Sequence, residues 1–159
     1  MKQTIDTTRF ITMLQNAAEE IENNHQALSK LDSFGGDGDH GTTILRAMKN
    51  MLQATEDSGS DRFKDLLSSI AWAVMGVDGG ATGPLFGSLF MGMSEAAGDK
   101  TSLDASDAAQ MFQRGLEEVK KYTKAEPGDK TLMDALVPAV TALGKEAETT
   151  DDLKNFRAV

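Results

Sequence analysis

The sequence predicts an all-α fold. Apolar residues recur at three- and four-residue spacing along nearly the whole chain, which is the period of an amphipathic helix. No segment shows the strict alternation of a half-buried strand, and no repeat or low-complexity linker interrupts the pattern. A chain of 159 residues has the usual length of one domain and can bury a sizeable core. We therefore expect a single domain over residues 1–159.

The first three helices are predicted from their apolar stripes. They are expected over residues 7–30, 42–56 and 61–76. Phe10 and Leu14 begin the first stripe, and the third helix follows a Gly-Ser start. Most methionines and phenylalanines of the chain lie on these or later stripes, so their expected role is core packing.

The later helices carry local start signals. They are expected over residues 84–97, 104–123 and 131–147, and a seventh begins near residue 149. Pro84 suits a first helical position, where its missing N–H would have no partner. Asp104 is a good N-cap. Pro138 lies inside the sixth helix and predicts a kink there.

The charge and composition of the chain narrow its functional class. The formal net charge of −9 argues against nucleic-acid binding, which relies on basic patches. It also means that a polyphosphate ligand would be repelled unless a divalent cation intervened. No segment reaches membrane-spanning length, and the N-terminus has no apolar signal region. The chain has no cysteine, which excludes disulfides and fits a reducing compartment, so a cytoplasmic location is expected.

Residues 31–41 (LDSFGGDGDHG) form the most informative segment. Asp32, Asp37 and Asp39 lie within eight residues and are separated by glycines, so their carboxylates can converge on one hard cation. Mg²⁺ prefers oxygen ligands and commonly bridges carboxylates to substrate phosphates. The segment leads into a predicted helix start at Thr42, where free backbone N–H groups attract phosphate oxygens. An ordinary acidic surface loop is the alternative interpretation.

Three familiar motifs are excluded for this segment. Residues 36–41 match the dinucleotide pattern G-x-G-x-x-G, but a long helix precedes them instead of a strand. An EF-hand loop beginning at Asp37 would have Thr42 and Met48 where glycine and glutamate are required. The sequence contains no G-x-x-x-x-G-K-[ST] P-loop either. A nucleotide site in this chain would therefore belong to another class.

A second glycine-rich segment precedes the fourth predicted helix. Gly79, Gly80 and Gly83 permit backbone conformations that expose N–H groups, and Thr82 adds a hydroxyl donor. Such a nest before a helix can bind an anion. The alternative is a tight turn in which Gly83 and Gly87 let helices pack closely. The loop at residues 124–131 (KAEPGDKT), taken by itself, is an ordinary Pro-Gly turn before a helix.

Taken together, segments 31–41, 79–87 and 124–131 resemble, in this order, the L subunit, or nucleotide-binding domain, of dihydroxyacetone kinase. The resemblance covers nearly the whole chain. It implies an up-down barrel of eight antiparallel helices, with about six to seven of them in this chain, and a nucleotide held in loops at one end. Family members continue for about two more helices and a closing loop, so the resemblance implies that this chain is incomplete at its C-terminus.

The resemblance also implies a set of site residues. Asp32, Asp37 and Asp39 would hold two Mg²⁺ ions that bridge the phosphates of ADP or ATP. Family members often have serine at the position of Thr82, and threonine keeps the hydroxyl. No residue is assigned a covalent catalytic role, because the nucleotide itself carries the phosphoryl group. The residues implied to line the nucleotide are His40, Gly41, Thr42, Thr43, Gly80, Ala81, Thr82, Gly83, Thr123 and Leu132.

The implied function is phosphoryl transfer by a kinase subunit. In one kind of family member, bound ADP accepts a phosphoryl group from a phosphotransferase-system protein of the M type and passes it to dihydroxyacetone on a separate K subunit. In the other kind, the domain uses free ATP and is fused to or paired with its K partner. A short chain resembles the first kind more, so it is expected to be inactive alone. The resemblance also implies a transcriptional regulator as a further partner.

The sequence leaves several alternative functions open. An ATP-dependent triose or tetrose kinase domain would share these motifs, whereas fatty-acid kinase domains typically have threonine in place of His40. A regulatory nucleotide-binding protein that contacts a transcription factor is a non-enzymatic alternative. A purely structural helical bundle would leave the three clustered aspartates unexplained. The phosphoryl donor, the ketose (dihydroxyacetone or erythrulose) and homodimer formation are not decided by the sequence.

Overall fold

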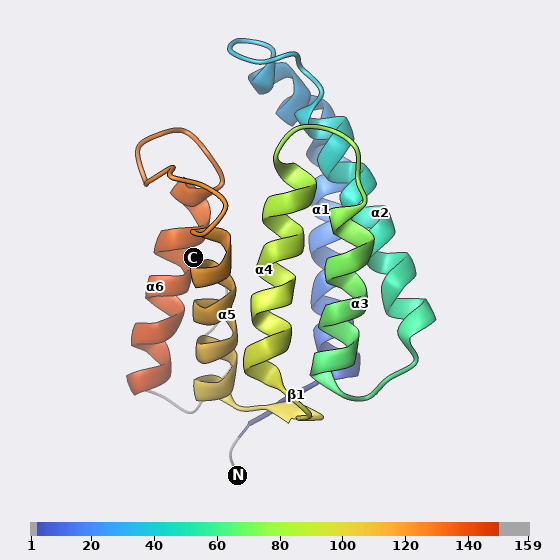
Figure 1. The fold of residues 1–159 in the computed structure, drawn as a ribbon, viewed down its shortest axis with the longest axis vertical. Coiled ribbons are helices and arrows are strands. Elements are labelled where there is room, and N and C mark those ends of the chain that lie inside the picture. Colours follow the sequence, from blue (N-terminus) through green and yellow to red (C-terminus); the bar gives the residue numbers. More distant parts are fainter. Residues whose placement is uncertain (1–2, 150–159) are drawn as a thin grey trace.

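The computed structural model of the protein describes residues 3–149, and within this range the fold is helical (Figure 1). One short segment near the N-terminus pairs with a second short segment around residue 103 in a two-stranded antiparallel sheet, with Ile5 opposite Leu103. The prediction of an all-α fold is confirmed. The elements are β1 (Ile5–Asp6), α1 (Thr7–Asp32), α2 (His40–Ser58), α3 (Phe63–Met75), α4 (Thr82–Ala97), β2 (Ser102–Leu103), α5 (Ala105–Val119) and α6 (Met133–Thr149).

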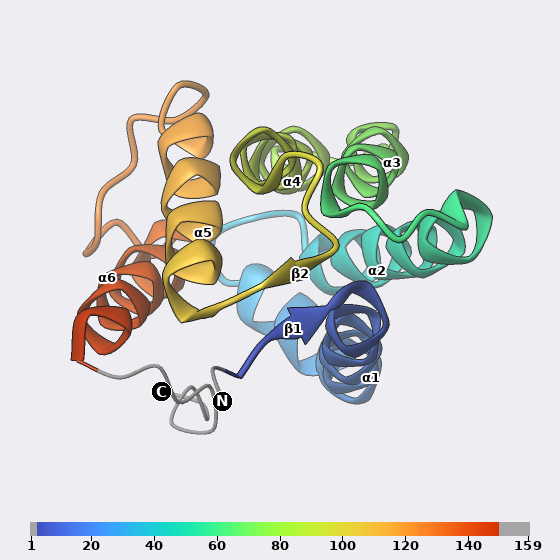
Figure 2. The same cartoon turned by 90° about the horizontal axis from the view of Figure 1, so that it is seen from below.

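The helices alternate in direction, and each packs against the next one along the chain. Seen from below, they follow one another in an arc from α1 to α6 (Figure 2). This up-down order places three loops at one end of the molecule, the upper end in Figure 1. These loops are residues 33–39, 76–81 and 120–132. No helix in the described part of the chain is long and apolar enough to cross a lipid bilayer.

The core forms where the predicted apolar stripes meet. Phe63 is fully buried and its ring contacts that of Phe10 edge to face, with 5.5 Å between the ring centroids. Several methionines are also buried, including Met51, which confirms their packing role. Residues of the first predicted stripe that lie outside the core include Met13, which is 47% exposed, and Leu31, which is 67% exposed at the end of α1.

Helix boundaries differ from the prediction where capping or tertiary structure decides them. The N-cap role of Asp104 is confirmed, because its side chain accepts a hydrogen bond from the Asp107 N–H at 2.9 Å and forms a capping box. Helix α5 ends four residues early, at Val119, and turns there through a Tyr122 N–H bond to the Val119 carbonyl. Helix α4 begins at Thr82, which places Pro84 within its first turn.

The short strands, Pro138 and the seventh predicted helix compare with the sequence predictions in different ways. The two strands have only two residues each, too short for an alternating pattern to be recognised in the sequence. Helix α6 continues through Pro138, and the kink expected there stays a prediction. The seventh helix expected from about residue 149 lies almost entirely outside the described residues.

Candidate functional site

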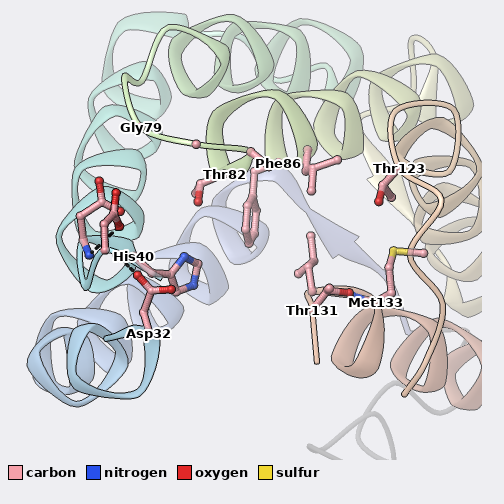
Figure 3. Close-up of a pocket in the computed structure, with 14 residues that line it drawn as sticks. Asp32, His40, Gly79, Thr82, Phe86, Thr123, Thr131 and Met133 are labelled. Carbon is pink, nitrogen blue, oxygen red and sulfur yellow. Dashed lines mark hydrogen bonds between the residues drawn. The ribbon is translucent and has the colours of Figure 1, made fainter. Parts of the chain in front are cut away.

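A cavity of about 390 Å³ lies among the three loops at one end of the molecule (Figure 3). Its volume falls within the range of small-ligand pockets. Residues from α1, α2, α4 and α6 and from all three loops contribute to its wall. The lining consists of Asp32, Asp37, Asp39, His40, Gly79, Gly80, Ala81, Thr82, Leu85, Phe86, Thr123, Thr131, Leu132 and Met133.

The three predicted metal ligands converge on one side of this cavity. Asp32, Asp37 and Asp39 each place a carboxylate oxygen so that all three oxygens lie within 4.8 Å of one another. Asp32 ends α1 and is half-buried, whereas Asp37 and Asp39 are exposed. Three carboxylates at this spacing suit a hard divalent cation such as Mg²⁺. The donor set therefore fits the ion that the sequence predicts.

Backbone hydrogen bonds fix the orientation of Asp32. Its Oδ2 accepts from the Gly38 N–H at 3.0 Å and from the His40 N–H at 3.4 Å. The loop can fold back in this way because Gly38 has φ +78°, a conformation that glycine adopts without steric cost. The second oxygen of Asp32 is not used in these two bonds. The loop sequence thus positions a carboxylate before any ligand binds.

The carboxylates of this cluster repel one another. Partial desolvation raises the pKa of the Asp39 carboxyl, and its hydrogen bond and charge interaction with Asp37 raise it further. The charge of Asp32 acts in the same direction, whereas His40 opposes it. Placing like charges close together disfavours their ionised forms. A bound divalent cation would offset that repulsion and favour all three carboxylates.

The start of α2 contributes one residue to the lining. Asp39 is the N-cap, and its carbonyl accepts from the Thr43 N–H at 2.9 Å. His40, the first helical residue, lines the cavity, whereas Gly41, Thr42 and Thr43 do not belong to the lining. Gly41 and Thr43 are buried instead, so the structure gives them a packing position.

The packing position of Thr43 supports the glycine loop between α3 and α4. A Cβ on Gly79 would lie only 2.7 Å from the Thr43 Oγ1. Gly79 also has φ +125°, a conformation that residues with a side chain rarely adopt. One turn further along α2, the Arg46 guanidinium donates to the Asp78 carbonyl at 3.2 Å. Helix α2 therefore holds the loop that forms the middle of the cavity wall.

The close-packing interpretation of the glycine-rich segment holds at Gly83 and Gly87, and anion binding by the glycines before them stays a prediction. Gly79 and Gly80 line the cavity together with Ala81 and Thr82, just before and at the start of α4. Gly83 is not part of the lining, because it packs on α3 and the turn after it. A Cβ there would lie 2.8 Å from the Val77 carbonyl oxygen and 3.2 Å from that of Val74. Gly87 similarly packs against Met75 and Ala71.

The wall opposite the acidic cluster is mostly apolar. Thr123 and Leu132, both predicted, line it together with Thr131 and Met133. Figure 3 shows Phe86 projecting into the space between these residues and the acidic side. No pattern in the sequence indicated that four further residues line the cavity: Leu85, Phe86, Thr131 and Met133. With a divalent cation held by the acidic cluster, the cavity would suit a ligand with an anionic end and a flat or apolar end.

The chain is similar over most of its length to known proteins. The family model described as the DAK2 domain matches residues 35–158. The chain is 36% identical over 151 residues to the PTS-dependent dihydroxyacetone kinase, ADP-binding subunit DhaL, of Lactococcus lactis, covering 95% of this chain and 75% of that protein. It is 33% identical over 150 residues to the PEP-dependent dihydroxyacetone kinase 1, ADP-binding subunit, of Listeria innocua, covering 94% and 75%.

The corresponding ADP-binding subunit of Escherichia coli is 30% identical over 144 residues, which cover 91% of this chain and 69% of that protein. The matches thus extend over all three loops that surround the cavity. The chain belongs to the DAK2 domain family, among the relatives of dihydroxyacetone kinase ADP-binding subunits.

Proposed function

We propose that this chain is the nucleotide-binding phosphotransfer subunit of a dihydroxyacetone kinase. The observation that carries the proposal is the convergence of three carboxylates within 4.8 Å at one side of a cavity whose opposite wall is mostly apolar. ADP or ATP combines a polyphosphate, which needs a cation beside so many carboxylates, with a flat base that suits the apolar wall. The relatives named as ADP-binding subunits support this choice.

In this proposal, Asp32, Asp37 and Asp39 hold two Mg²⁺ ions. When bound, the ions neutralise charge on the phosphates and orient them for in-line transfer. The protein contributes by positioning: the Gly38 and His40 amides fix Asp32, and the loop that contains Gly80 presents backbone at the start of α4. Phosphoryl transfer depends mainly on such positioning and electrostatic stabilisation. No side chain of this subunit is assigned a covalent role.

The phosphoryl donor and the acceptor would be held by other subunits. The three relatives are each named as one subunit of a PTS- or PEP-dependent kinase. We therefore infer a K subunit that holds the ketose and a phosphotransferase-system subunit of the M type that supplies the phosphoryl group. Contacts with a transcriptional regulator or with a second copy of the chain stay predictions.

Calorimetric titration of ADP tests the nucleotide site. With Mg²⁺ present, we expect binding with a dissociation constant in the micromolar range or below, because the acidic cluster and the apolar wall act together. Chelation of Mg²⁺ is expected to remove this binding, since ADP would then face uncompensated carboxylates. The purified protein is first checked for retained nucleotide, which would favour ADP as a bound coenzyme. A folded sample that does not bind Mg²⁺-ADP would contradict the proposal.

A coupled kinase assay tests the subunit assignment. The isolated chain with ATP, Mg²⁺ and dihydroxyacetone is expected to form no dihydroxyacetone phosphate above background. Addition of a K subunit and the phosphotransferase-system components is expected to start turnover, and parallel reactions with erythrulose identify the preferred ketose. Robust phosphorylation by the isolated chain would show that it binds the ketose itself, and would contradict its assignment as a subunit that depends on partners.

A further inference from the structure

The apolar wall of the cavity depends on a loop without regular structure. This loop, residues 120–132, joins α5 to α6 and supplies Thr123, Thr131 and Leu132 to the lining. Met133, the next residue, begins α6 and also lines the cavity. The shape of this wall is therefore set by the backbone of a loop whose conformation has to be stabilised by specific hydrogen bonds.

Asp134, in the first turn of α6, supplies two of these hydrogen bonds. Its Oδ1 accepts from the Gly128 N–H at 2.7 Å, and its Oδ2 accepts from the Thr131 N–H at 2.8 Å. These amides, that of Thr131 first, hold the pKa of the Asp134 carboxyl below its ordinary value. A negative charge in the first turn of a helix is also favoured by the helix dipole. The side chain is thus a charged acceptor that binds the loop at two points.

The segment between these two points has an unusual backbone. Gly128 has φ +108° and Lys130 has φ +59°, and a left-handed conformation is uncommon for a residue with a Cβ. Such a conformation persists when the surrounding structure fixes it. Asp134 accepts from Gly128, before Lys130, and from Thr131, after it. These two bonds stabilise the turn and fix the position of Thr131, where the loop begins to line the cavity.

We propose that Asp134 is a positioning residue for the nucleobase end of the site. This inference rests on the proposed function, in which the base lies against the apolar wall. Asp134 itself is not among the residues that line the cavity. It acts through Thr131, whose amide it binds and whose Oγ1 accepts from the Met133 N–H at 3.2 Å. Two lining residues are therefore linked to Asp134: Thr131 directly through its amide, and Met133 through the hydroxyl of Thr131.

The same loop contains a matched control. The Asp129 Oδ2 accepts from the Glu126 N–H at 2.8 Å, and neither residue lines the cavity. Asp129→Asn and Asp134→Asn remove the same charge from the same short segment. In Asp134→Asn the amide nitrogen cannot accept, so one of the two bonds to the loop is lost and two donors face each other. Only Asp134→Asn is expected to move the wall.

Calorimetric titrations with Mg²⁺-ADP and with Mg²⁺-pyrophosphate test the proposal. Pyrophosphate offers the phosphate end of the ligand without the base. Asp134→Asn is expected to weaken ADP binding roughly tenfold, because part of the binding free energy, about one hydrogen bond to a charged group, is then used to restore the conformation of the wall. Pyrophosphate affinity is expected to stay within about twofold, since the acidic cluster is untouched. Asp129→Asn is expected to leave both affinities unchanged.

The outcomes separate this role from a general structural one. A parallel loss of ADP and pyrophosphate binding, an unchanged ADP affinity, or an equal effect of Asp129→Asn would overturn the role of Asp134. Failure of the unmodified chain to bind Mg²⁺-ADP would instead contradict the proposed function. If Asp134→Asn does not give the far-ultraviolet circular dichroism of the parent, Asp134→Glu replaces it. That variant keeps the charge but displaces the oxygens, and the same selective loss of ADP affinity is expected.

Discussion

Asp37→Ala is expected to abolish magnesium-dependent ADP binding while the protein stays folded. Asp37 supplies one of three carboxylates whose oxygens lie within 4.8 Å of one another. Loss of groups that only orient metal ligands already costs roughly 10–100-fold in affinity, so removal of a ligand should cost at least about 100-fold. The Asp37 side chain is exposed, and its Oδ1 accepts a long bond of 3.3 Å from the Asp39 N–H. Its removal therefore disturbs the loop little.

The metal-free protein provides a second measurement on the same variant. Three neighbouring carboxylates repel one another, so removal of one is expected not to lower the thermal unfolding midpoint of the metal-free chain. The stabilisation that Mg²⁺-ADP gives the parent protein is expected to disappear. Glu56→Ala is the control, because Glu56 is exposed on α2 and carries the same charge outside the site. Retained magnesium-dependent binding in Asp37→Ala, or an equal loss in Glu56→Ala, would contradict the metal assignment.

The features that could be predicted from the sequence are those encoded locally. The first helix, which contains Phe10, and the cap at Asp104 depend on neighbours within one or two turns, and both appear as expected, although Met13 on the stripe of that helix is exposed. The acidic loop could be recognised because its three carboxylates lie within eight residues of one another. The early end of α5 at Val119 could not, because no proline or glycine marks it there. Helix ends without such signals are decided by tertiary packing.

Residues whose role depends on contacts between different helices and loops could not be predicted from the sequence. Phe86 and Met133 lie on apolar stripes, and the periodicity of a stripe does not distinguish the core from a cavity wall. Thr43 was predicted to line the nucleotide, but its contact with Gly79, which joins α2 to the loop after α3, depends on how the helices pack. Asp134 gave no signal because its partners are backbone amides, whose positions no side-chain pattern encodes.

Gly41→Ala is expected to give the largest loss of stability of any single substitution considered. Gly41 lies in the first turn of α2, where this helix crosses α1. A Cβ at this position would overlap the carbonyl oxygen of His25 and lie 2.7 Å from the Ser29 Oγ. The obstructing atom belongs to the backbone of α1, so the two helices have to separate. Overpacking usually costs about 1–3 kcal/mol, and a clash with backbone should cost about 3 kcal/mol or more.

The same displacement is expected to reach the metal site. Asp32 ends α1, and its Oδ2 accepts from the His40 N–H at the start of α2. Separation of the helices would weaken this bond and move the carboxylate away from Asp37 and Asp39. ADP affinity is therefore expected to fall in the fraction of Gly41→Ala that stays folded, as measured by calorimetry below its unfolding midpoint.

Gly144→Ala is the control, because the same substitution is expected to raise the free energy of unfolding there instead of lowering it. Gly144 lies within α6, and a Cβ there would meet nothing within 4 Å. Alanine is favoured over glycine in a helix interior, so this variant should be more stable by about 0.5–1 kcal/mol. Urea denaturation of both variants compares the two free energies of unfolding with that of the parent. If Gly41→Ala were as stable as the parent, α1 and α2 could not cross as closely as described, and the acidic loop would need another means of holding Asp32.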